Sequence, residues 1–330
     1  MIAPAHNGKI RPVDPRRDLS SIADLIELCF IHQMDDDGRD YLRHIRHAAG
    51  DLSLQRWVRG ANEQVSVPLF GYVWEENGHI VGNLTLIPFF REGKWRYLIA
   101  NIATHPDFRG RGIAYQLTQR GIQHVQEIGA SAVWLQVRED NWAALHLYVK
   151  LGFLERARRT TWGLSNSPPP LIPLNGVEVS WRRGSDWKNQ INWLQRTYPA
   201  EVAWNLNFNP DRFAPGIFRS FTRFLNSERQ EQWAVRLGLD LLGIAIWDAS
   251  AYNNETVWVA PNPVCEDQAL VVLLTILRRQ VDSSRALTIN YPANRGAVSF
   301  QRAGFDLQNT LIWMEINFES ASETFSSVER

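Results

Sequence analysis

The stretch that decides the fold is residues 105–115, with the sequence HPDFRGRGIAY. An apolar strand pattern precedes it and an amphipathic helix pattern follows it. A glycine-rich turn at a helix N-terminus suits phosphate, because the first helical amides lack acceptors and the helix dipole is positive there. Gly110 and Gly112 let a ligand approach the backbone, and Arg109 and Arg111 add charged donors. The turn therefore predicts an anion site, and the alternative is an ordinary solvated loop.

The surrounding sequence predicts alternating strands and helices. Asn77-Gly78 favours a tight primed turn between two strands, and the apolar run 132–137 is typical of a central strand. The helix after the turn should bury Ile113, Leu117, Val125 and Ile128. The expected strands are residues 10–13, 70–74, 80–87, 95–104, 132–137 and 154–164, and the expected helices are residues 18–31, 111–129 and 141–150. A further helix should hold Tyr41, Leu42 and Ile45, whereas residues 50–66 give no prediction.

A proline-rich run, residues 165–176, separates the two halves of the chain and predicts a stiff, extended linker. After it the element order restarts, and YVKLGF at 148–153 is matched by FQRAGF at 300–305. The expected strands are residues 177–181, 232–237, 241–247, 256–260, 286–290 and 309–316, and the expected helices are 186–196, 268–281 and 293–302. This repeat predicts two copies of one domain, residues 1–164 and 177–318, before a polar tail, residues 319–330.

Bulk composition narrows the class of protein. A chain of 330 residues with 45% hydrophobic and 21% charged residues is typical of a globular protein with two domains. Its formal net charge of 0 provides no overall attraction to nucleic acid or to an anionic membrane. Cys29 and Cys265 lie among apolar neighbours, so we expect free thiols and a cytoplasmic location. The N-terminus shows no secretory pattern, and no oligomeric state is predicted.

The segment Arg109–Ala114 fits the Q/R-x-x-G-x-G/A signature of the GNAT acetyltransferases. Asn141, Tyr148 and Gly152-Phe153 fit the second conserved block of that family. Residues 10–164 resemble the family strongly, and residues 177–317 resemble it as a decayed copy. The resemblance implies an α/β (α+β) fold, in which a mixed, mostly antiparallel sheet flanked by helices is present twice in tandem.

The resemblance also implies a site for acetyl-CoA as co-substrate. Backbone groups of one strand would pair with the pantetheine arm, and loop amides would hold the pyrophosphate beside Arg109. Asn141 would contact the pantetheine arm, and Tyr148 would point at the thioester sulfur. The implied backbone contacts are Ile102, Ala103 and Thr104 for pantetheine, and Gly110, Arg111, Gly112, Ile113, Ala114 and Tyr115 for the pyrophosphate.

The implied reaction is direct transfer of acetyl to an amine in a ternary complex. A tyrosine hydroxyl is a suitable proton donor to the leaving sulfur, and the amine needs a base or a water chain. Family members often carry a carboxylate near the positions of Ala100 or Gln136, and neither is acidic here. The weaker candidates are Glu75, Glu76 and His146. Because no base is evident, a non-catalytic acyl-CoA-binding or sensing protein is the alternative function.

Other readings stay open at this stage. Tyr148 has an alternative role in the core, and Asn141 has one as a helix cap. The carboxylates of residues 35–37 would either attract a cationic acceptor or form a solvated turn. His44 and His47 have no evident third ligand, so no metal site is predicted. The acceptor is predicted only as a small-molecule amine or a peptide or protein N-terminus.

The second half lacks the parts that the first half offers. Where a phosphate loop belongs, residues 261–267 have the sequence PNPVCED. Two prolines have no N–H to donate, and two carboxylates repel a pyrophosphate. Phe300 replaces the tyrosine and carries no proton to give. The sequence therefore predicts that the second copy does not bind the cofactor.

Overall fold

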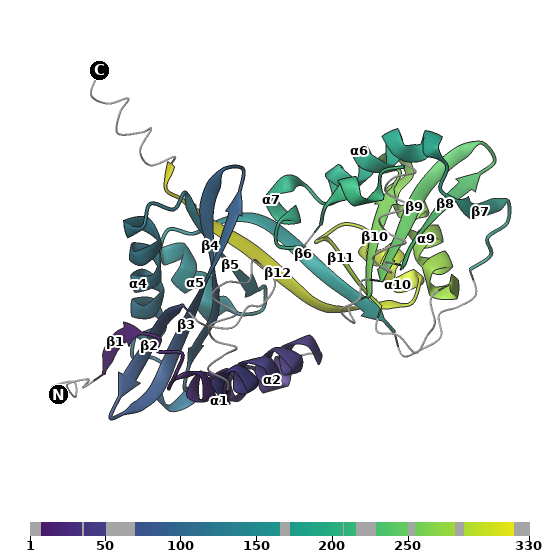
Figure 1. Ribbon diagram of the computed structural model, residues 1–330. Coiled ribbons are helices and arrows are strands. Elements are labelled where there is room, and N and C mark those ends of the chain that lie inside the picture. Colours follow the sequence, from purple (N-terminus) through teal and green to yellow (C-terminus); the bar gives the residue numbers. More distant parts are fainter. Residues whose placement is uncertain are drawn as a thin grey trace, which may run out of the picture. The chain divides into compact units, whose positions relative to one another are not determined.

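A computed structural model describes residues 8–34, 36–50, 70–165, 172–206, 208–215, 229–249, 255–280 and 287–319 (Figure 1). The chain divides into two compact units. Unit 1 comprises residues 1–155 and 313–330, and unit 2 comprises residues 156–312. Within the described residues, no helix is long and apolar enough to cross a membrane.

Unit 1 contains a mixed sheet in the order β1-β2-β3-β4-β5-β12. The pairs from β1 to β4 are antiparallel, and β4 pairs with β5 in parallel, which confirms the expected sheet type. Asn77 and Gly78 both have positive φ in the turn between β2 and β3, as the Asn-Gly pattern predicts. The elements are β1 (Lys9–Pro12), α1 (Leu19–Phe30), α2 (Asp36–Gly50), β2 (Gly71–Glu76), β3 (His79–Arg91), β4 (Lys94–Thr104), α4 (Ile113–Glu127), β5 (Ala132–Arg138), α5 (Trp142–Lys150) and the last part of β12 (Phe305–Asn317).

Helices cover both faces of this sheet. Val73 packs into the apolar cluster of α1 and α2, whereas its neighbour Tyr72 makes a hydrogen-bond contact of 3.1 Å with His124 of α4. Successive strand residues point to opposite faces, so α4 lies on the face opposite α1 and α2. A Cβ added at Gly82 would lie 2.7 Å from Ile113, which shows how closely α4 packs on β3. This packing holds the N-terminus of α4 against the sheet.

The prediction for the buried face of α4 was wrong at one residue. Ile113, Leu117 and Val125 are buried as expected. Ile128 is 49% exposed, because the helix ends at Glu127 and Ile128 is its C-cap residue. A helical period extrapolated beyond the last helical residue no longer indicates which way a side chain points.

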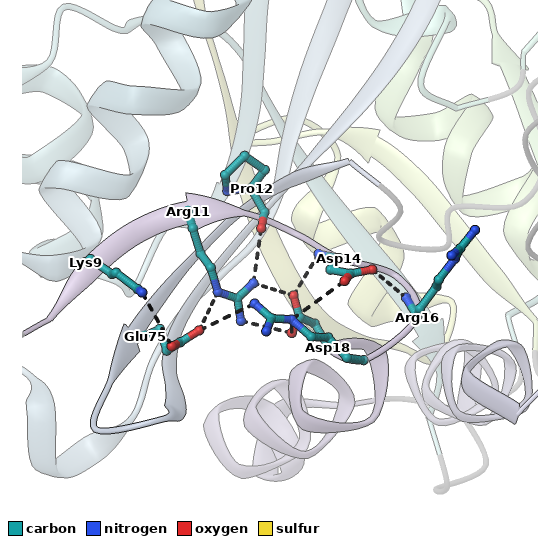
Figure 2. A network of polar contacts seen from close by, with 8 residues as sticks. Lys9, Arg11, Pro12, Asp14, Arg16, Asp18 and Glu75 are labelled. Atoms are coloured by element: carbon teal, nitrogen blue, oxygen red, sulfur yellow. Dashed lines mark hydrogen bonds and ion pairs between the residues drawn. The ribbon is translucent and has the colours of Figure 1, made fainter.

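An ion-pair network joins the first strand of unit 1 to β2 and α1 (Figure 2). Arg11 donates to Asp18 at 2.6 and 3.0 Å and also pairs with Glu75. The Arg11 guanidinium lowers the pKa of Glu75 below its usual value. The side chain of Asp18 is 3% exposed, and its charge is compensated by Arg11 and, at 3.4 Å, by the exposed Arg17. The network therefore fixes the edge strand β1 to its neighbour β2 and to the start of α1.

We expect Arg11→Met to lower the free energy of unfolding of unit 1 by about 3 kcal/mol, because it removes two charged hydrogen bonds from a buried carboxylate and leaves the exposed Arg17, at 3.4 Å, as its cationic partner. Differential scanning calorimetry measures the loss as a lower midpoint of the unit 1 transition. Arg46→Met is the matched control, since Arg46 bonds the exposed carboxylates of Asp24 and Glu27. That change should cost no more than about 1 kcal/mol. Equal losses in both variants would contradict the assignment.

Unit 2 repeats the element order of unit 1. Its sheet has the order β12-β6-β11-β10-β9-β8-β7, with β10 and β11 parallel and the other registered pairs antiparallel. Its core is formed around α9, and Trp162 stacks on Phe300 at 4.7 Å between ring centroids. The elements are β6 (Leu154–Leu164), β7 (Val177–Trp181), α6 (Trp187–Thr197), α7 (Ala200–Ala203), β8 (Arg229–Leu237), β9 (Asp240–Ala249), β10 (Glu255–Pro261), α9 (Glu266–Gln280), β11 (Thr288–Pro292), α10 (Ala297–Arg302) and the first part of β12.

The division between the units falls inside two strands. Residues 156–164 of β6 belong to unit 2, and residues 313–317 of β12 belong to unit 1. Each sheet is thus completed by the last strand of the other sequence repeat. This division differs from the expected boundaries at residues 164 and 177, because a hydrogen-bonded strand belongs to the sheet that it joins. Residues 166–171 of the expected linker and residues 320–330 of the expected tail lie outside the described residues.

Candidate active site

Strands β4 and β5 separate towards their C-terminal ends. Their registered pairing runs from Arg96↔Ala132 to Ile99↔Leu135, although β4 continues to Thr104 and β5 to Arg138. The amide of His105 donates to Val81 of β3 at 2.9 Å. Because backbone groups alternate along a strand, those of Ile102 and Thr104 face the β5 side, whereas those of Ala103 face β3. The opening therefore exposes backbone donors and acceptors to a ligand that enters between the strands.

The glycine-rich turn places a row of backbone amides at the N-terminus of α4. Gly110 and Gly112 have φ of +77° and +76°, which residues other than glycine rarely adopt. An added Cβ would meet no atom within 4 Å at Gly110 and only Gln116, at 3.9 Å, at Gly112. Within the described ranges, no hydrogen-bond acceptor is found for the amides of Gly110, Arg111, Gly112, Ile113, Ala114 and Tyr115. This is the geometry of an anion cradle.

Both arginines of the turn lie beside these amides. Arg109 is exposed and donates from Nε to the carbonyl of Thr104 at 3.3 Å. Arg111 pairs with Glu76 at 3.3 Å, and its guanidinium lies 4.6 Å from the centroid of the Phe108 ring. Glu76 thus orients an arginine of the loop. The side chain of Glu76 is only 12% exposed, and its second carboxylate oxygen is buried with no partner in the described part of the chain.

Helix α5 carries both side chains of the second motif. Asn141 is its N-cap and accepts from the amide of Ala144 at 3.2 Å through Oδ1, which leaves its Nδ2 exposed for a ligand. Tyr148 is 7% exposed, and its ring lies edge-on to Phe153 at 6.0 Å. Burial raises the pKa of Tyr148 above its ordinary value, so the phenol keeps its proton at neutral pH. Asn141 directly precedes the first helical residue, Trp142, and Tyr148 lies in the second turn of the same helix, so one short segment fixes both positions.

The weaker base candidates have other contacts. Glu75 pairs with Arg11, and Glu76 pairs with Arg111. The Nδ1 of His146 lies 2.7 Å from the carbonyl oxygen of Trp142, so this nitrogen donates to its own helix and only Nε2 is left for other chemistry. The carboxylates of residues 35–37, a candidate site for a cationic acceptor, lie outside the described part of the structure.

One buried carboxylate of unit 1 was missed in the sequence. Glu315, which is 8% exposed, lies on β12, the strand next to β5. Its distance of more than 160 residues along the chain from both motifs hides it from any spacing argument. Only the passage of β12 into unit 1 reveals that it belongs to the same sheet.

The corresponding opening in unit 2 is filled by the chain itself. Registered pairing between β10 and β11 consists of Thr256↔Thr288 alone. The amide of Val259 on β10 donates to the hydroxyl of Tyr198 at 3.3 Å, and Tyr198 is 1% exposed. Phe208, Trp258 and the guanidinium of Arg159 surround its ring at 4.8, 5.1 and 5.1 Å. A backbone donor that would face a ligand in unit 1 is thus already bonded here.

The expected phosphate-loop position of unit 2 is also occupied by internal contacts. Glu266, in the first turn of α9, accepts from Tyr291 at 2.7 Å and from Arg295 at 2.6 and 3.1 Å. Asn262 accepts from the amide of Val264 at 3.0 Å. The N-terminus of α9 therefore carries an acidic side chain, Glu266, which is held in place by Arg295.

Comparison with known proteins gives matches in sequence and in fold. Residues 31–153 match the model of the acetyltransferase (GNAT) family. A 62-residue segment is 40% identical to the [ribosomal protein bS18]-alanine N-acetyltransferase of Salmonella typhimurium, covering 19% of this chain and 42% of that protein. A 92-residue segment is 33% identical to N-alpha-acetyltransferase 30 of Schizosaccharomyces pombe, covering 28% of this chain and 61% of that protein. The chain thus spans about half the length of the curated relatives that it matches.

Two solved structures share the fold across almost the whole chain. A GCN5-related N-acetyltransferase from Sphaerobacter thermophilus superposes with a TM-score of 0.55 at 16% identity, covering 94% of this chain and 95% of that one. A glucosamine N-acetyltransferase region of a fungal multi-domain GH3 β-N-acetylglucosaminidase gives a TM-score of 0.57 at 12% identity, covering 96% and 38%. At these identities the likeness concerns the fold alone.

Proposed function

Because residues 31–153 belong to the GNAT acetyltransferase family, we propose that this protein is an acetyl-CoA-dependent N-acetyltransferase with its active site in unit 1. The observation that carries the proposal is the row of amides from Gly110 to Tyr115, which have no acceptor within the described residues and lie beside a strand opening. An anion at the loop and an extended arm between the strands are the two parts of a coenzyme A molecule that this geometry suits.

The residues of unit 1 fit acetyl-CoA as a substrate. The loop amides and Arg109 would hold the pyrophosphate, Ile102 and Thr104 would pair with the pantetheine arm, and Asn141 would add a donor through Nδ2. Bound in this way, acetyl-CoA supplies an activated acyl group. The acceptor nitrogen forms a bond to the acetyl carbon as the C–S bond breaks, and Tyr148 gives its proton to the leaving sulfur. The proton of the amine goes to water or to a base.

We propose a peptide or protein N-terminus as the acceptor. Two relatives are named for acetylation of protein amino groups. One is the [ribosomal protein bS18]-alanine N-acetyltransferase, and the other is N-alpha-acetyltransferase 30. An α-amino group has a pKa of about 7.7 to 8.0, against about 10.4 for lysine, so a larger share of it is neutral at pH 7. Such an amine needs little help from a base. That agrees with Ala100 and Gln136, which stand where family members often carry a carboxylate.

We propose that unit 2 is a degenerate copy that does not bind the cofactor. Tyr198 occupies a backbone donor of β10, and Glu266 with Arg295 occupies the N-terminus of α9. The free thiols of Cys29 and Cys265 support a cytoplasmic location for the whole protein.

Isothermal titration calorimetry with acetyl-CoA should give about one site per chain. A double variant, Tyr198→Phe with Glu266→Gln, should keep that stoichiometry, because its changes lie in unit 2. Two equivalent sites would contradict the degenerate role of unit 2, and an absence of binding would contradict the proposed function.

Release of CoA distinguishes an enzyme from an acyl-CoA sensor. We expect the protein to release CoA with peptides that carry a free N-terminus and not with the same peptides after chemical N-acetylation. Binding of acetyl-CoA without CoA release across peptides and small amines would favour the sensing alternative. Release of CoA with small amines but not with peptides would agree with the proposed acetyltransferase activity. It would contradict the proposal that the acceptor is a peptide or protein N-terminus.

A further inference from the structure

Strand β4 carries a β-bulge where it leaves β5. The β3–β4 register shifts between Asn83↔Ala103 and Thr85↔Ala100, so two residues of β4, Asn101 and Ile102, lie opposite one residue of β3. Asn101 has φ of +51°, a left-handed conformation that costs free energy for a residue with a side chain. Such a conformation inside a strand persists only where the surroundings hold it in place.

Side chains from two other elements hold Asn101. Asn83 of β3 donates from Nδ2 to the carbonyl oxygen of Asn101 at 2.9 Å. The side chain of Asn101 donates from Nδ2 to the hydroxyl of Tyr41 on α2 at 2.6 Å. Asn83 is fully buried, and its Oδ1 has no hydrogen-bond partner within the described residues. A buried amide with one unsatisfied oxygen costs free energy, and the bond to Asn101 offsets part of that cost.

The bulge determines which backbone groups face the opening. Backbone groups alternate sides with a period of two, so one extra residue reverses every group that follows it. With the bulge, the N–H groups of Ile102 and Thr104 face the β5 side, as the bond of His105 to Val81 shows. Without it they would turn to β3. The bulge begins two residues after Ile99, where the pairing with β5 ends.

We propose that Asn83 and Tyr41 are positioning residues for acyl transfer, which hold the bulge of Asn101 so that the next backbone N–H, that of Ile102, faces the acyl group. The inference rests on the proposed function. Neither side chain has to touch the substrate. Both act through Asn101. The acceptor of the Ile102 N–H is the carbonyl oxygen of the thioester, which becomes more negative as the amine attacks, whereas the carbonyl group of Ile102 and the backbone of Thr104 pair with the pantetheine arm.

The test compares turnover with affinity for CoA, which lacks the acyl carbonyl. Tyr41→Phe removes one hydroxyl and should lower kcat about tenfold, and Asn83→Ala and Asn101→Ala should each lower it by about ten- to a hundredfold, because small misplacements in an active site have effects of this size. The Kd for CoA, measured by calorimetry, should rise by a clearly smaller factor than kcat falls, since the loop amides that hold the pyrophosphate are untouched. Asn101→Gly should retain more activity than Asn101→Ala, because glycine adopts positive φ without strain.

Two comparisons separate positioning from general stability. In the Asn101→Gly background, Tyr41→Phe should have no further effect on kcat, because its partner amide is already gone. Tyr72→Phe is the matched control, since it removes another mostly buried tyrosine hydroxyl of unit 1, which contacts His124, and should leave kcat unchanged.

If the wild-type protein is active and the variants Tyr41→Phe and Asn101→Ala have the same kcat as the wild type, this inference is wrong. The proposed function would not be affected by that result. Equal losses of kcat and CoA affinity in every variant would also overturn it. A wild type that binds no acetyl-CoA would refute the proposed function, and this inference with it.

Discussion

Replacing Gly112 by valine should weaken acetyl-CoA binding by about 100-fold or more. Gly112 is the N-cap residue of α4 at φ +76°, and a β-branched residue is strongly disfavoured in that conformation. The amides on either side of it would turn away from one another. A loss of about 2.7 kcal/mol corresponds to 100-fold, and about two charge-assisted hydrogen bonds supply that much. Calorimetric titration of acetyl-CoA against the variant measures the change in Kd.

Gly129→Val is the matched control for this variant. Gly129 has φ of +74°, follows the C-terminal end of α4 and would also place its new Cβ in open space. The two substitutions therefore impose similar backbone strain and differ in their distance from the loop. Gly129→Val should lower the unfolding midpoint by a similar amount while leaving the Kd within about twofold. Equal affinity losses in both variants would mean that strain in unit 1, and not the loop, controls binding.

Replacing Tyr148 by phenylalanine should lower kcat about 100-fold with little change in acetyl-CoA affinity. A positioned general acid contributes about 100- to 10,000-fold, and the leaving sulfur loses its donor in this variant. The ring stays in place against Phe153, because only the hydroxyl is removed. Steady-state release of CoA gives kcat, and titration calorimetry gives the Kd.

The pH profile supplies a second readout of Tyr148. Burial raises the pKa of Tyr148 above the ordinary tyrosine value of about 10, so the proton donor is present at every pH below 10. Wild-type turnover should therefore show no fall between pH 7 and 10 that is due to this phenol. A large loss of cofactor affinity in Tyr148→Phe, with kcat retained, would instead mark Tyr148 as a structural tyrosine.

The local geometry of the candidate site could be predicted from the sequence, because the loop and the short helix after Asn141 each consist of contiguous residues. The loop needs two glycines at positive φ and an open helix N-terminus, and Gly110 and Gly112 state both within three positions. Asn141 is the N-cap of α5 and Tyr148 lies within that helix, so one short segment places both residues. The two readings of Asn141 are compatible, since Oδ1 caps the helix and Nδ2 is left exposed.

The proposed degeneracy of the second half is supported by contacts that the sequence did not show. The prolines and carboxylates of residues 261–267 indicated a missing loop. The structure adds Tyr198, which bonds the amide of Val259 from more than 60 residues away, and Arg295, which neutralises Glu266. These contacts connect residues distant in the chain, so neither periodicity nor spacing points to them.

The sequence by itself determined the family resemblance, the glycine-rich turn, the short helix after Asn141 and the repeated element order, because all of these depend on short-range patterns of glycine, apolar residues and turns. The tertiary structure alone decided which strand completes which sheet, and where Asn83, Tyr41 and Glu315 lie. Strand pairing is a long-range choice, because every strand edge offers the same backbone donors and acceptors. The division inside β6 and β12 and the left-handed conformation of Asn101 both result from such pairing, and a linear pattern does not encode them.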